Sequence, residues 1–157
     1  MIDNWKKIRV RRQLHADNAM RELGQKIAQR DVIEESIETL QQARHALQQQ
    51  RIAEMMEFEK DMEQGQYQST LSIGFNKFLR LLEVTDRHVH FQIFELKLAL
   101  NAARHEVRLA QRHFRNMSNK CEKIDEAIQE MKNVARLKKE LVEEDVLEER
   151  SMQSKNE

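Results

Sequence analysis

The apolar residues in the second half of the chain recur at alternating spacings of four and three. From Val89 to Ala135, fourteen successive positions of this pattern are all apolar, although only 39% of the chain is hydrophobic. Such a long heptad repeat is typical of a coiled-coil helix. Upstream, Phe75, Phe78 and Leu82 have the same spacing, with an apparent shift of phase near Gln92. The repeat positions are Val89, Ile93, Leu96, Leu100, Ala103, Val107, Ala110, Phe114, Met117, Cys121, Ile124, Ile128, Met131 and Ala135.

The first half of the chain shows a weaker helical pattern. Leu23 and Ile27 lie on one apolar stripe, and the stripe from Ile33 to Leu47 is offset from it by a three-residue insertion. An insertion of this kind is a stammer, which locally overwinds a coiled coil. Cations also fall at positions that would contact a partner helix. We therefore expect an imperfect contact surface, interrupted by Arg30, Arg44 and Arg51.

Turn-forming residues are scarce. The 157 residues include three glycines and no proline, whereas average usage would give roughly eleven and eight. This composition strongly disfavours sheet folds, and the only turn-like stretch lies between Gly65 and Gly74. We predict an all-α fold in which two long helices form an antiparallel coiled-coil hairpin, with the second helix longer. The whole chain, 1–157, forms one hairpin: a helix over about 3–63, a connection over about 64–71, a helix over about 71–150 and a frayed tail over 151–157.

The charges support an antiparallel arrangement. Lys and Arg total 27, and Asp and Glu also total 27. If the chain reverses near residue 69 or 70, the acidic stretch 31–38 lies beside the basic stretch 104–108. The basic stretch 6–12 then lies beside the acidic stretch 125–130. The same register leaves the second helix without a partner beyond about residue 138, as an acidic, amphipathic end that we expect to bind another helix.

Motifs for catalysis or metal binding are absent. The chain has no glycine-rich phosphate loop, no Cys-x-x-Cys and no His-Glu-x-x-His. The six histidines lack a spacing that would let them share a metal, so we expect them on the surface. Cys121 falls at a coiled-coil contact position, where a buried, inert thiol is expected. The sequence therefore predicts a protein that is not an enzyme and has neither metal nor cofactor.

Two local clusters are candidate interaction surfaces. The basic run 5–12 is consistent with a solvated helix end, a docking surface for an acidic partner, a membrane-surface helix or a nucleic-acid contact. The balanced net charge disfavours nucleic acid. No apolar run reaches the ~20 residues of a membrane span, and the basic N-terminus lacks the apolar core of a signal peptide, so we expect a cytoplasmic protein. Around the predicted hairpin tip, an apolar cluster could cap the coil or bind a partner: Met55, Met56, Phe58, Met62, Tyr67, Phe75, Phe78 and Phe91.

Three segments carry a family resemblance. They are IRVRRQLHADNA at 8–19, FNKFLRLLE at 75–83 and KKELVEEDVLEER at 138–150. Together with the long hairpin, the first and the last resemble the YscO/SpaM/HrpO proteins of type III secretion injectisomes, which are similar to the flagellar export protein FliJ. The segment 75–83 resembles the start of the second helix in the flagellar relatives. Members of that family resemble the stalk of rotary ATPases. They bind the hexameric export ATPase and the export-gate membrane protein, and substrate chaperones are further partners.

The resemblance implies roles for particular residues. ATPase binding would involve Lys6, Lys7, Arg9, Arg11, Arg12, Leu141, Glu144 and Leu147. Contact with the export gate or a chaperone would involve Met55, Phe58, Phe75, Phe78 and Leu82. The protein would be a cytoplasmic monomer, peripherally associated with the secretion apparatus at the inner membrane. The alternative is a self-associating coiled-coil scaffold or secretion chaperone, in which the apolar line of the second helix pairs between chains.

Overall fold

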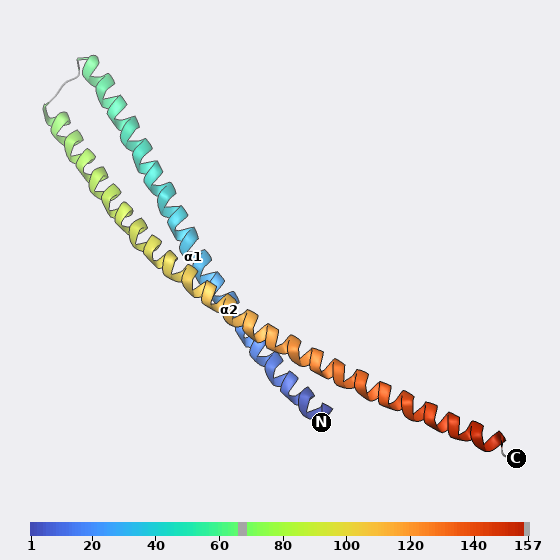
Figure 1. Ribbon diagram of the computed structural model, residues 1–157. Coiled ribbons are helices and arrows are strands. Elements are labelled where there is room, and N and C mark those ends of the chain that lie inside the picture. The colour runs from blue at the N-terminus through green and yellow to red at the C-terminus, as the bar shows by residue number, and fades with distance from the viewer. Residues whose placement is uncertain (66–68, 156–157) are drawn as a thin grey trace. The chain divides into compact units, whose positions relative to one another are not determined.

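Two long helices account for the architecture. The computed structural model describes residues 1–65 and 69–155 (Figure 1). Helix α1 spans Ile2–Glu63, and helix α2 spans Ser69–Lys155. They run antiparallel and form an all-α hairpin in which the second helix is the longer, and the described residues include no strand. The predicted fold class is confirmed.

The helix ends differ slightly from the expected ones. Helix α1 ends just before Gly65, whose φ of 75° is a conformation that glycine adopts without steric cost. Helix α2 begins at Ser69, so Gly74 lies within the helix and not in the connection. Its last turns are helical to Lys155, where a frayed tail was expected from residue 151. In these turns, Ser151 and Ser154 each donate a hydroxyl hydrogen bond to a carbonyl three residues earlier.

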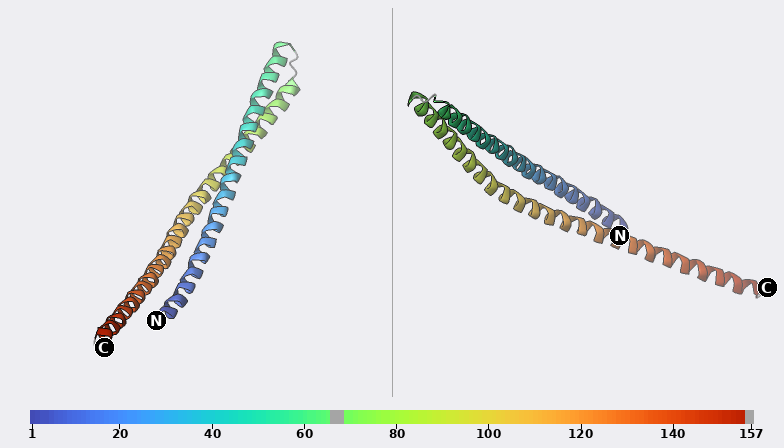
Figure 2. Two further views of the ribbon diagram at one scale, coloured as in Figure 1. Left: turned by 90° about the vertical axis from the view of Figure 1, so that its right-hand side faces the viewer. Right: turned by 90° about the horizontal axis from the view of Figure 1, so that it is seen from above.

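Packing divides the chain into two compact units, each containing part of both helices. One unit comprises 1–24 with 109–157, and the other comprises 25–108. Figure 2 shows that the two helices of the 25–108 unit run alongside each other. Residues 66–68, including Tyr67 of the expected tip cluster, lie outside the described residues.

The buried face of α2 follows the predicted heptad pattern. Of the fourteen predicted positions, all except Ala135 are buried or half-buried. The same spacing continues upstream through Asp86, Leu82, Leu79 and Phe75, which are also at least half-buried. The predicted phase shift near Gln92 was therefore wrong, because a polar residue, Asp86, occupies a contact position. We call the positions from Phe75 to Met131 the α2 seam.

Helix α1 also has one continuous line of contact positions, which we call the α1 seam. Its spacing alternates between three and four without interruption, so the predicted stammer was wrong. The pattern was hidden because charged residues occupy many of the contact positions. All members except Arg9 and Arg51 are at least half-buried: Ile2, Trp5, Arg9, Arg12, Ala16, Ala19, Leu23, Lys26, Arg30, Ile33, Ile37, Leu40, Arg44, Leu47, Arg51, Glu54 and Phe58.

Three cations of the α1 seam pair with acids on α2. Arg9 pairs with Asp125 in the first unit. In the 25–108 unit, Lys26 Nζ lies 2.6 Å from Glu106 Oε2. There, Arg44 Nε also lies 2.9 Å from Asp86 Oδ1, and Arg44 Nη1 lies 3.0 Å from His90 Nδ1. The cations that interrupt the apolar pattern of α1 are thus partly compensated by the facing helix.

The ion pairs also correct the predicted register. Arg9 with Asp125, and Arg104 with Glu34 at 3.2 Å, confirm that both pairs of charge blocks face each other. Arg44, however, pairs with Asp86, whereas a reversal near residue 69 or 70 would place it beside about residue 95. The reversal lies several residues earlier, between Glu63 and Ser69. The unpaired part of α2 accordingly begins after Met131 and not near residue 138.

Candidate interaction surfaces

The basic N-terminal segment is divided by the helix into inward and outward residues. Arg9 donates a hydrogen bond to Asp125, and this contact raises the pKa of its guanidinium. Lys6 lies 3.9 Å from Asp3 of its own helix. Lys7 and Arg11 are exposed and form no ion pair with the described residues. Of the predicted ATPase-binding cations, Lys7 and Arg11 are therefore the most available to a partner.

Arg12 has a different environment, because it is half-buried at the edge of a polar hollow. The hollow has a volume of about 370 Å³ and is lined by His15 of α1 and by His113 and Lys120 of α2. Arg12 and Lys120 form no ion pair with the described residues. Glu22 also lines the hollow, so its carboxylate offsets part of the positive charge that Arg12 and Lys120 add to that of Lys7 and Arg11.

The free end of α2, which we define as residues 132–155, is a helix with no facing helix. Every residue in it is exposed, and at about 1.5 Å per residue it is about 36 Å long. It extends beyond the N-terminal end of α1 (Figures 1 and 2). The predicted binding residues Leu141 and Leu147 are 60% and 64% exposed, and Glu144 is also exposed. The structure brings these residues together on one accessible helix.

The residues predicted at the hairpin tip separate into an inner and an outer group. Phe58 and Phe75 stack with ring centroids 4.1 Å apart and nearly parallel planes. Phe78 is half-buried, and Leu82 is only 8% exposed in the α2 seam. Met55 is the only exposed residue of the five predicted for a gate or chaperone contact. Four further apolar residues near the ends of the two helices are also exposed: Met56, Met62, Leu71 and Ile73.

A second apolar row on α2 was not recognised in the sequence. Val84, Phe91 and Leu98 repeat every seven residues, and each is more than half exposed. Leu81 and Phe94 extend the same exposed surface. At 100° per residue, this row lies on the side of α2 opposite the α2 seam. The seven-residue spacing of this row is visible in the sequence, but the apolar repeat of the α2 seam is longer and more regular.

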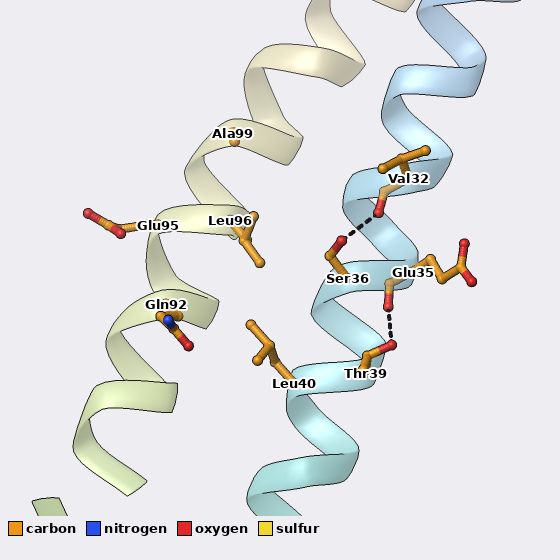
Figure 3. Close-up of a pocket in the computed structure, with 9 residues that line it drawn as sticks. All are labelled: Val32, Glu35, Ser36, Thr39, Leu40, Gln92, Glu95, Leu96 and Ala99. Carbon is orange, nitrogen blue, oxygen red and sulfur yellow. Dashed lines mark hydrogen bonds between the residues drawn. The ribbon is translucent and has the colours of Figure 1, made fainter. Parts of the chain in front are cut away.

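A groove along the 25–108 unit was also missed. It has a volume of about 780 Å³, and its apolar surface includes Val32 and Leu40 of α1 and Leu96 and Ala99 of α2. Figure 3 shows Leu40 and Leu96 pointing toward one another across the space between the helices. The carboxylates of Glu35 and Glu95 point outward on opposite sides of it. Sequence patterns could not locate the groove, because its shape depends on which faces of the two helices meet.

Groups with catalytic or metal-binding potential are dispersed. All six histidines are exposed and Cys121 is buried, as predicted. Within residues 1–65 and 69–155, no group of three or more His, Cys, Asp or Glu residues is arranged to hold a metal ion. In the same part of the chain, neither helix contains a segment that is both long and apolar enough to cross a membrane.

Comparison of the chain with protein-family models, curated proteins and solved structures gives no match.

Proposed function

We propose that this protein is a stalk component of a bacterial type III secretion export apparatus. It binds the hexameric export ATPase and the export gate, promotes protein secretion and performs no chemistry itself. The observation that carries this proposal is the free end of α2. A long exposed helix, adjoining a helix pair that ends in unneutralised cations, is suited to insertion into a ring of subunits. The resemblance of segments 8–19, 75–83 and 138–150 supplies the identity of the ring.

The two ends of the hairpin would have different partners. The ATPase would contact Lys7, Arg11 and the free end around Leu141, Glu144 and Leu147. The export gate, or a secretion chaperone, would contact the exposed apolar surface around Met55. The protein would then act in the cytoplasm, peripherally associated with the apparatus at the inner membrane.

The test is to add the purified protein to the purified export ATPase. We expect a larger hexamer fraction in light scattering and faster ATP turnover. Leu141→Asp/Leu147→Asp should abolish both effects, since it places charge on the apolar surface of the free end. The matched control is Leu81→Asp/Leu98→Asp, which alters two similarly exposed leucines on α2 outside the free end and should retain both effects.

A charge-reversal variant tests the basic end. Lys7→Glu/Arg11→Glu should abolish ATPase binding and leave helicity intact, because neither side chain pairs within the described residues. Arg9 is left unchanged, because reversing its charge would also break its pair with Asp125. The control Lys77→Glu/Arg80→Glu changes the same number of exposed cations near the other end of the hairpin. No effect of the wild-type protein on hexamer content or turnover would contradict the proposal.

A self-associating scaffold is the second candidate function. The α2 seam is already covered by α1, so pairing of this seam between chains would require the hairpin to open. The exposed row of Val84, Phe91 and Leu98 is the observation that favours self-association without opening. Light scattering separates the two functions, because a hairpin monomer has a mass of 18.8 kDa and a scaffold at least twice that.

A further inference from the structure

The groove of the 25–108 unit combines an apolar floor with carboxylates that lack partners. Two other acids of α1 nearby are neutralised: Glu34 pairs with Arg104, and Asp31 pairs with Arg30 at 2.8 Å. Glu35 and Glu95, on the two sides of the groove, form no ion pair with the described residues. An apolar surface bordered on both sides by free negative charge is complementary to an apolar surface bordered by positive charge.

The groove offers few polar groups that a ligand could use. The Ser36 hydroxyl donates a hydrogen bond of 2.9 Å to the carbonyl of Val32. Thr39 donates one of 3.0 Å to the carbonyl of Glu35 (Figure 3). Both donors are thus used within α1, as the dashed lines in the figure indicate. The remaining polar side chain of the lining is the amide of Gln92. Recognition in the groove would therefore depend on apolar contact, on the two carboxylates and on this one amide.

The spacing of the lining residues defines the shape of the occupant. On α1 they lie at positions 32, 35, 36, 39 and 40, and on α2 at 92, 95, 96 and 99. This is the i, i+3, i+4, i+7 repeat of one helical face, present on both helices. The groove therefore runs along the helices for about two turns, or roughly 12 Å. A third helix laid along it could place its own apolar face against Leu40 and Leu96.

We propose that this groove binds an amphipathic helix of a partner protein, with apolar residues at i, i+3 or i+4, and i+7 and with Lys or Arg on both sides. The helix would contact Val32, Leu40, Leu96 and Ala99 with its apolar face and place cations beside Glu35 and Glu95. This is the helix-in-groove mode of recognition. Nucleic acid and anionic lipid do not fit, since their phosphates would be repelled by both carboxylates.

This inference is separate from the proposed function. It concerns the middle of the hairpin, whereas the ATPase and gate surfaces lie toward its ends. Binding to the groove can therefore be measured without either of those partners.

The probe is a fluorescein-labelled, 18-residue helical peptide made of Leu and Lys, with leucines at the stated spacing and lysines on both sides. The full-length protein at low salt should bind it with a micromolar Kd in fluorescence anisotropy. A Leu/Glu peptide of the same pattern should bind at least tenfold more weakly. Amide shift changes in NMR spectra should be confined to residues near 32–40 and 92–99. Changes concentrated in the acidic part of the free end, 140–149, would overturn the proposal.

Variants test the carboxylates and the floor separately. Glu35→Gln/Glu95→Gln should weaken peptide binding about fivefold, as expected for two exposed charge contacts. The control Glu57→Gln/Glu59→Gln removes the same charge from exposed positions of α1 outside the groove and should leave binding unchanged. Equal affinities for the two double variants would contradict the proposal.

Ala99→Arg should fill the groove and reduce binding at least tenfold. Ala102→Arg places the same side chain on an exposed position of α2 outside the groove and should have no effect. Unchanged melting temperatures would show that both variants fold. If wild-type protein is a dimer in light scattering and Ala99→Arg makes it a monomer, a second copy occupies the groove and the proposal is wrong.

Discussion

The two seams have the same spacing but different chemistry. From Phe75 to Met131, the α2 seam is apolar except at Asp86. The α1 seam has the same geometry, but seven of its members are charged: Arg9, Arg12, Lys26, Arg30, Arg44, Arg51 and Glu54. An apolar row favours burial against any apolar row and discriminates poorly between registers. The charged members of α1 favour the register in which their acids face them. The comparison indicates that α2 contributes most of the burial and that α1 contributes specificity.

The largest expected effect comes from placing a charge in the α2 seam. Ile93 is 5% exposed and belongs to a core cluster with Ile37, Val89 and Leu100. In Ile93→Asp, a carboxylate replaces an apolar side chain of this cluster, which should lower the free energy of unfolding by about 4 kcal/mol. Urea unfolding followed by circular dichroism measures this loss.

A matched change in the α1 seam should be tolerated. Arg51 is an exposed member of that seam in the same unit. Arg51→Asp also introduces a carboxylate, but water remains in contact with it, so we expect a change below about 1 kcal/mol. Similar losses in Ile93→Asp and Arg51→Asp would refute the division of roles between the seams.

The second prediction concerns the Arg44 and Asp86 pair. Both side chains are about one-third exposed, so Asp86→Ala should leave a half-buried guanidinium with only His90 as a partner. We expect the free energy of unfolding to fall by about 1–3 kcal/mol. The double variant Arg44→Leu/Asp86→Leu should regain most of this loss, because an apolar pair replaces the ion pair.

Register is the property that the double variant should lose. If the charges specify how the helices align, Arg44→Leu/Asp86→Leu should remain helical but show broadened NMR resonances along the 25–108 unit. Sharp resonances and an unchanged set of contacts in the double variant would mean that the apolar positions alone fix the alignment.

The seams also explain what the sequence could and could not predict. The α2 seam was predictable because nearly every member is apolar. The α1 seam was not recognised, because Lys26, Arg30 and Arg44 break an apolar pattern. The partners of Lys26 and Arg44 lie tens of positions away, on α2. The end of α1 was predictable from Gly65, since the helix stops where glycine has a positive φ.

Binding surfaces were predictable only where they depend on one helix. The free end follows from the unequal helix lengths, although its start required the observed register. Leu82 was expected at a contact with a gate or chaperone and is instead buried between the helices. The groove between Leu40 and Leu96 depends on the mutual rotation of two helices, which no pattern along one segment contains.

The third prediction separates helix propensity from seam chemistry. Gly24 lies in α1, and a Cβ added there would have no atom within 4 Å. Gly24→Ala should raise the free energy of unfolding by up to about 1 kcal/mol, because alanine is favoured in helices and glycine is not. Gly74→Ala in α2 is similarly unobstructed and should also be stabilising. Gly65→Ala should be destabilising, since its φ is positive. Thermal melts of the three variants measure these signs, and a destabilised Gly24→Ala would contradict the continuous α1 helix.

The smallest expected effect is the pH dependence of the Lys26 and Glu106 pair. The hydrogen bond and charge of Lys26 lower the pKa of Glu106 below its ordinary value of 4.5. A lowered pKa in the folded state means that the pair stabilises the protein above pH 4.5 and that this stabilisation is lost as the pH falls through the lowered pKa. Glu106→Gln should therefore melt at a slightly lower temperature than the wild type at pH 7, and the difference should vanish in acid. Because the Glu106 side chain is about half exposed, high salt should also reduce the difference. Glu122→Gln, which removes an exposed acid with no ion pair among the described residues, should show neither dependence; if it does, the effect belongs to net charge and not to the α1 seam.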